Sequence, residues 1–190
     1  SYRRDGSSRF GENSRWGDFW SVAASWRIKS EEFLQNVDWL SSLRLRASYG
    51  VNGTMPTDNY CHMSLYEYGR NYNSLPGGRV KTIADPNLTW ESNYTFNVAL
   101  ESAFFNNRLT ANVEFYNRDS KDLLWKIPIS RVTGFVEQLT NVGEINNKGF
   151  EIELSGDIIK TKDFTWNLGL NASTLKSKVK KLYDGEDIVW

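Results

Sequence analysis

The stretch of sequence that decides the fold covers residues 93–104 and reads NYTFNVALESAF. Apolar or aromatic side chains recur at every second position along it: Tyr94, Phe96, Val98, Leu100 and Phe104. The positions between them hold polar or small residues. Because successive side chains of a strand point to opposite faces, this alternation predicts a long strand with one apolar face and one polar face.

The following residues, 108–118, repeat the alternation and complete a hairpin. Asn106 and Asn107 lie between the two strands, and asparagine tolerates the positive φ that a two-residue hairpin turn requires. Such a turn places Phe104 opposite Leu109, Leu100 opposite Val113 and Val98 opposite Phe115. All of these apolar side chains then share one face, and a slip of one residue would scramble both faces.

A second hairpin is predicted from residues 150–158 and 164–171, which alternate in the same way. A three-residue link, Lys160–Lys162, keeps the faces matched and sets Gly156 opposite Trp166, where the missing side chain leaves room for the indole. The apolar face of the two hairpins is expected to carry one common set of residues: Val98, Leu100, Val113, Phe115, Ile152, Leu154, Leu168 and Leu170.

Two earlier strands and a short helical turn precede these hairpins. Residues 20–28 alternate, with Ile28 on the apolar face, and so do residues 43–51. Between them, residues 30–34 predict one helical turn with Ser30 as its N-cap and acidic residues in the first turn. With a strand ending in the first few residues, the sequence predicts an all-β, antiparallel up-and-down meander of about seven strands.

The connections alternate in length, which suggests how such a sheet is used. Short turns follow one end of the strands, whereas long links cover about residues 52–91 and 120–144. Alternation itself is equally compatible with a soluble β-sheet carbohydrate-binding module. A partial transmembrane β-barrel is favoured because the apolar faces lack charges, aromatic residues cluster near strand ends and no amphipathic helix is available to cover the sheet.

Composition excludes several other classes of function. Lys plus Arg and Asp plus Glu are equal in number, 23 each, so no basic excess indicates a nucleic-acid partner. One cysteine, Cys61, rules out a disulfide framework or a cysteine-rich metal site. Its neighbour His62 is the only histidine, and the pair is interpreted as a chance loop pair because nucleophile chemistry needs a positioned base. We therefore expect no enzyme activity, no metal and no cofactor.

Several segments, taken in order, resemble the SusC/RagA-type TonB-linked transporters of Bacteroidetes. They run over nearly the whole chain: residues 2–11 (YRRDGSSRFG), Trp16 with Phe19-Trp20, 43–53 (LRLRASYGVNG), 88–91 (LTWE), 93–98 (NYTFNV), 114–118 (EFYNR), 141–144 (NVGE) and 147–149 (NKG). Each match is weak alone, and the ordered set is specific.

The resemblance implies that residues 1–190 are a partial TonB-dependent receptor β-barrel, without the plug, TonB box and signal peptide of the family. It further implies a place in the cell outer membrane, in contact with lipid. The intact protein would import oligosaccharides or peptides, with a SusD-like lipoprotein lid outside and the TonB complex supplying force.

Candidate contact residues lie in the first long link, which is rich in tyrosine. Tyr66, Tyr68 and Tyr72, together with Arg70 and Asn71, are suited to stacking on sugar rings or contacting a lid protein. An equally good interpretation is that these aromatic rings pack within the loop.

Overall fold

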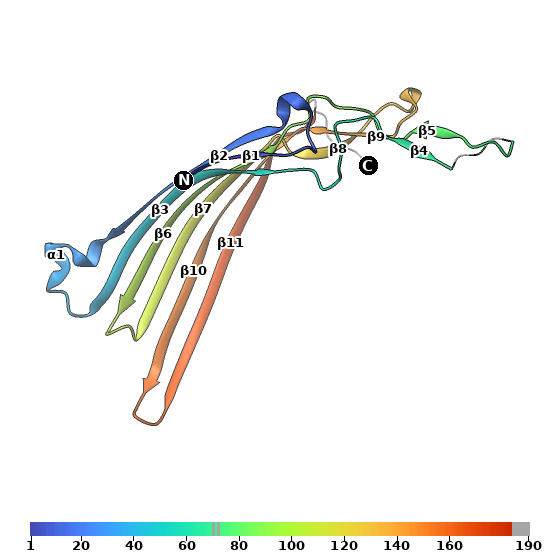
Figure 1. Ribbon diagram of the computed structural model, residues 1–190. Helices are drawn as coiled ribbons and strands as arrows, with labels where there is room; N and C mark the ends of the chain where they lie inside the picture. Colours follow the sequence, from blue (N-terminus) through green and yellow to red (C-terminus); the bar gives the residue numbers. More distant parts are fainter. Residues whose placement is uncertain (70, 72, 184–190) are drawn as a thin grey trace.

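Seven strands form one curved antiparallel sheet in the computed structural model, which describes residues 1–69, 71 and 73–183 (Figure 1). The strands are β1 (Tyr2–Gly6), β2 (Trp16–Arg27), β3 (Leu40–Thr54), β6 (Glu91–Phe104), β7 (Leu109–Lys121), β10 (Glu144–Lys160) and β11 (Thr165–Lys181). Their order in the sheet is their order along the chain, and every neighbouring pair is antiparallel. The predicted up-and-down meander is confirmed.

The hairpin between β6 and β7 has the register that the sequence predicts. Phe104 pairs with Leu109, and Leu100 pairs with Val113. Phe105, Asn106 and Asn107 all have positive φ, and the amide of Arg108 donates to the Phe105 carbonyl across the turn at 3.2 Å. Two asparagines therefore accept the backbone conformation that closes this turn.

The turn between β10 and β11 differs from the prediction. The link has four residues, 161–164, and the amide of Thr161 donates to the Phe164 carbonyl at 2.8 Å. Gly156 pairs with Leu168 rather than Trp166, so the predicted pairing was wrong. A bulge between Asp157 and Ile159 inserts one extra residue, which restores the match of the two faces that an even link would break.

The connection between β2 and β3 contains the expected helical turn, with a different cap. Strand β2 ends at Arg27, so Ile28 lies in a 3-10 turn, Ile28–Ser30, and not in the strand. Helix α1 covers Glu32–Gln35, and its N-cap is Glu31, not Ser30. Glu31 instead accepts a hydrogen bond from the Trp26 indole at 2.9 Å. No helix among the described residues is both long and apolar enough to cross a membrane.

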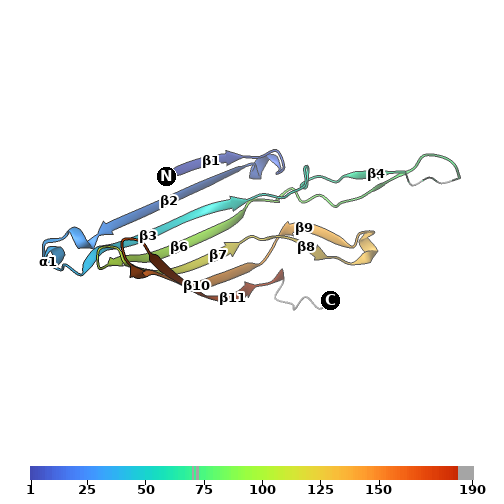
Figure 2. The same cartoon turned by 90° about the horizontal axis from the view of Figure 1, so that it is seen from below.

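Two small hairpins occupy the long links. They are built from β4 (Tyr66–Tyr68) with β5 (Gly78–Val80) and from β8 (Leu124–Pro128) with β9 (Glu137–Asn141). Short 3-10 turns lie at Glu12–Ser14 and Arg131–Thr133. Figures 1 and 2 show both hairpins beyond one end of the sheet, with α1 and the tight turns at the other. Strands this short show no alternation, so the sequence did not predict them.

The strands are staggered relative to one another. One row of pairs runs from Arg27 through Arg44, Glu101 and Asn112 to Glu153. Strand β2 ends at this row, whereas β10 continues to Lys160, so each tight turn lies further along than the one before it (Figure 1). Such a stagger accompanies the tilt of strands in a barrel wall.

Candidate functional site

The sheet presents an apolar face along most of its width. Its central row joins five strands in register: Trp26, Leu45, Leu100, Val113 and Ile152. Leu100 and Val113 are each 40% exposed, although they lie on interior strands of the sheet. The pairings of β6, β7, β10 and β11 place the predicted set of eight apolar residues on this one face. We call it the outward face.

Aromatic rings mark both margins of the outward face. Trp39 stacks on Phe104 near the tight turns, with ring centroids 5.8 Å apart. Trp20 meets Tyr49 edge-on toward the other end, at 5.6 Å. Amphipathic rings at two levels of an apolar surface are typical of membrane interfaces.

The opposite face of the sheet is polar and charged. Glu101 lies between Arg44 and Arg46, with N···O distances of 3.6 and 2.6 Å. Glu114 stands directly opposite Glu151 on the neighbouring strand. This surface suits contact with water or with a polar partner. Among the described residues, no three His, Cys, Asp or Glu side chains converge as ligands for a metal ion.

A small hydrophobic core closes the end of the sheet that carries the long links. It consists of Phe10, Phe19, Val51, Leu88 and Trp90, and both Phe10 and Leu88 are fully buried. The Trp90 ring lies 4.9 Å from Phe10 and 5.4 Å from Phe19. The long links therefore start from a packed base rather than from the ends of free strands.

Arg9 ties the β1–β2 turn to the first long link. Its guanidinium donates to the Pro56 carbonyl at 2.6 Å, and its own carbonyl lies 2.9 Å from His62 Nδ1. The neighbouring Cys61 thiol donates to the Asp58 carbonyl at 2.9 Å. Burial, together with the nearby Asp58 carboxylate, raises the pKa of the Cys61 thiol above its usual value. The side chains of Cys61 and His62 thus help to hold the first long link in place.

Asn141 joins the two long links through its side-chain amide. Its Oδ1 accepts from the Thr89 amide at 2.7 Å, and its Nδ2 donates to the carbonyls of Thr89 and Asp122 at 2.8 Å each. Nearby, the Lys126 ammonium donates to Glu137 at 2.6 Å across the β8–β9 hairpin, and this carboxylate raises the pKa of Lys126. These contacts give the second link a defined shape.

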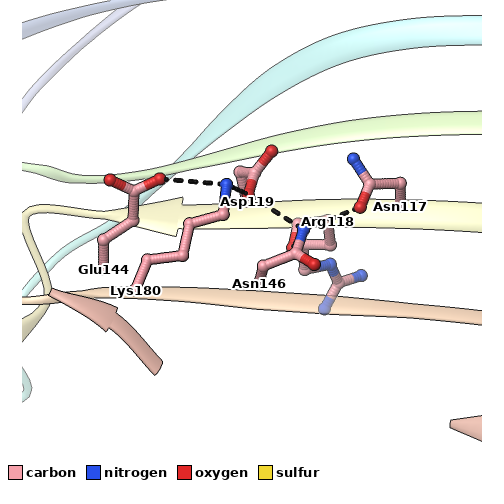
Figure 3. A network of polar contacts seen from close by, with 6 residues as sticks. All are labelled: Asn117, Arg118, Asp119, Glu144, Asn146 and Lys180. Carbon is pink, nitrogen blue, oxygen red and sulfur yellow. Dashed lines mark hydrogen bonds and ion pairs between the residues drawn. The ribbon is translucent and has the colours of Figure 1, made fainter. Parts of the chain in front are cut away.

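A polar network crosses β7, β10 and β11 just below the long links (Figure 3). Lys180 binds both Asp119 and Glu144, the latter at 3.3 Å. Asn146, which is buried, donates to Asp119 at 2.9 Å and to Asn117 at 2.7 Å. The network locks three strands together and places one lysine between two carboxylates.

The predicted contact residues lie partly within and partly outside the described residues. Tyr66 and Tyr68 lie two residues apart on β4, hence on one side of the β4–β5 hairpin, and are 62% and 80% exposed. Asn71 is also exposed. Arg70 and Tyr72 lie outside the described residues. On the other side of the hairpin, Glu67 binds Arg79 at 3.1 Å.

Comparison with known proteins places this geometry in a family. The family model described as "TonB dependent receptor-like, beta-barrel" matches residues 1–188. The chain belongs to this receptor barrel family. The TonB-dependent receptor SusC of Bacteroides thetaiotaomicron is 38% identical over 97% of this chain and 19% of its own length. The TonB-dependent receptor P39 of Formosa agariphila is 35% identical over 97% of this chain and 18% of its own length.

Solved structures agree with the sequence relatives. A chain in the structure of the RagAB peptide transporter has a TM-score of 0.90 and 37% identity, over 97% of this chain and 20% of that chain. This receptor barrel segment therefore spans about a fifth of the length of the relatives it matches. Those relatives are named as receptors and transporters, not as enzymes.

Several residues of the receptor barrel have roles that sequence reasoning missed. These residues are Phe10, Leu88, Trp90 and Asn141, and all lie in segments that resemble the family. The alternation of apolar residues along strands says nothing about contacts between loops. The one available signal was the position of these short segments, which lie beside the long links in the sequence. In the structure they form the base of the loops.

Proposed function

We propose that this chain is part of the wall of an outer-membrane, TonB-dependent importer for oligosaccharides or peptides. The observation that carries the proposal is the two-faced sheet, with an exposed apolar face and a charged opposite face. In a barrel wall the first would meet lipid and the second would line the lumen. No catalytic role is proposed.

A soluble carbohydrate-binding module is the alternative, and the apolar face argues against it. Soluble proteins rarely leave a large contiguous apolar surface uncovered. Val22 and Trp26 are 61% and 49% exposed at one side of the outward face, and Leu170 is 59% exposed at the other. Within the described part of the chain, these side chains remain open to the surroundings across the sheet, as lipid contact requires.

The orientation in the membrane is the first testable consequence. Barrels of the outer membrane keep tight turns in the periplasm and long loops outside. We propose that β4–β5 and β8–β9 are extracellular and that the turn containing Lys162 is periplasmic. The SusD-like lipoprotein would then cover the loop end, and the TonB complex would act on the whole importer from the other side.

Site-directed labelling tests this orientation in the full-length protein. Tyr68→Cys and Lys162→Cys, each in a Cys61→Ser background, are exposed to a polyethylene-glycol maleimide too large for outer-membrane pores. Tyr68→Cys should react in intact cells, whereas Lys162→Cys should react only after the outer membrane is permeabilised. Labelling of Lys162→Cys in intact cells would overturn the orientation.

The tyrosines of the first long link are proposed to contact the substrate or the lid protein. Tyr66 and Tyr68 support this role because both rings are exposed on one side of a hairpin that projects beyond the sheet (Figure 2). Aromatic faces stack well on sugars and on peptide side chains. Tyr72, Arg70 and Asn71 follow in the same link and are proposed to act with them.

Two triple variants of the full-length importer separate the possible roles. Changing Tyr66, Tyr68 and Tyr72 to Ala should lower uptake at limiting substrate several-fold, with normal barrel assembly. The matched change to Phe keeps the rings and should retain most uptake. Loss of lid co-purification in the Ala variant would assign the contact to the lid, and unchanged uptake would leave the rings as loop packing.

A further inference from the structure

Three lysines on β10 and β11 form a cluster on the outward face. Lys148 stands directly opposite Lys176, and Lys178 follows two residues later on the same side of β11. All three are exposed. Like charges placed directly opposite one another on a sheet are destabilising, so this arrangement needs a physical reason.

The cluster lies where the apolar surface ends. On β10, the next outward-facing residue after Lys148 is Phe150, and the apolar residues continue from there to Ile159. At about 3.3 Å per residue and a tilt of about 40°, this stretch rises roughly 23 Å, close to the about 25 Å apolar band of outer-membrane barrels. The lysines therefore stand at the level of lipid headgroups on the long-loop side.

Nearby acidic side chains do not neutralise the cluster. Asp119 and Glu144 are the carboxylates beside it, and both are bound to Lys180 (Figure 3). Asp119 also accepts a hydrogen bond from Asn146, the residue that pairs with Lys178. Among the described residues, no ion pair engages Lys148, Lys176 or Lys178, so the patch carries an excess of positive charge.

We propose that Lys148, Lys176 and Lys178 form a binding surface for the phosphate groups of lipids in the outer leaflet. Ammonium groups on flexible stems can rise from the edge of an apolar belt and share an anionic headgroup. A bound phosphate would also relieve the repulsion between Lys148 and Lys176. The inference rests on the proposed membrane orientation and adds a lipid ligand to it.

The test uses the full-length transporter in nanodiscs of phosphatidylcholine doped with phosphorylated lipid A. Retained lipid A is counted by native mass spectrometry for the parent and for a Lys148→Gln/Lys176→Gln variant. A Lys81→Gln/Lys162→Gln variant makes the same charge change in a loop and in a tight turn. Affinity for phosphorylated lipid A should fall about fivefold for each lysine removed from the cluster and stay unchanged in the control.

Three results would overturn the inference. They are equal retention by the cluster variant and the parent, equal retention of dephosphorylated lipid A, and full displacement of the lipid by inorganic phosphate, which would indicate a site for free anions. The proposed function has a separate readout. If the parent itself fails to insert in the nanodisc, the membrane assignment fails, whereas normal insertion without lipid A selectivity rejects only the lipid site.

Discussion

Replacing Val113 with arginine tests most directly which face of the sheet meets lipid. Val113 lies between Leu109 and Phe115 on β7 and is 40% exposed on the outward face. The next acidic residue on that face of the strand is Asp119, about 20 Å away along β7 and beyond the reach of an arginine side chain. The new charge would therefore remain unpaired in hydrocarbon.

The expected loss for Val113→Arg is about 2–4 kcal/mol in the free energy of unfolding, the range for arginine near the midplane of a barrel in lipid. Asn112→Arg is the matched control, since it adds the same side chain one residue away on the opposite face. Asn112 already lies 3.3 Å from the Glu153 carboxylate, which would pair with the arginine. That variant should change stability by less than about 1 kcal/mol.

The measurement is a guanidinium titration of the full-length protein in lipid vesicles, followed by tryptophan fluorescence. The heat-dependent shift in gel migration provides a second readout of barrel integrity. The reasoning is refuted if the two variants lose equal stability, or if Asn112→Arg loses more. Either result would mean that the outward face is not the lipid face.

Other variants test contacts within and between the loops and strands. Gly149→Ala should lower the free energy of unfolding by about 1–3 kcal/mol, because an added Cβ would collide with a carbonyl oxygen of β11. Gly169→Ala is the control and should have a small effect, because the nearest atom to its added Cβ is 4.0 Å away. Asn141→Ala removes the hydrogen bonds to Thr89 and should speed proteolysis of the long links without changing the unfolding midpoint of the sheet. Because the pKa of Cys61 is raised, its thiol should be alkylated more slowly in the folded protein than in the urea-unfolded chain at neutral pH. The difference in rate should vanish at high pH. Equal rates at neutral pH would contradict the burial of the thiol.

The β6–β7 hairpin was predictable to the residue because two independent constraints agree there. Alternation over both strands allows one register, and Asn106 with Asn107 supplies a turn of the matching length. The residues of the outward face were predictable for the same reason, since successive side chains of a strand point to opposite faces.

The β10–β11 turn was not predictable from parity. Ile158 and Ile159 are both apolar and adjacent, so the sequence pattern is compatible with a three-residue link or with a bulge and a four-residue link. The structure contains the bulge, and the pairing of Gly156 moves to Leu168 as a result. A bulge leaves one residue unpaired, and two adjacent apolar residues do not by themselves distinguish it from the end of a strand.

The sequence by itself determined a two-faced meander, because alternation is a local property that each strand carries in its own residues. Only the tertiary structure decided how the loop end is built. Phe10 lies far from Leu88 and Trp90 in the chain, and they meet because the antiparallel strands bring their two segments to the same end of the sheet. Contacts of that kind depend on where strands end in space, and no period in the sequence encodes them.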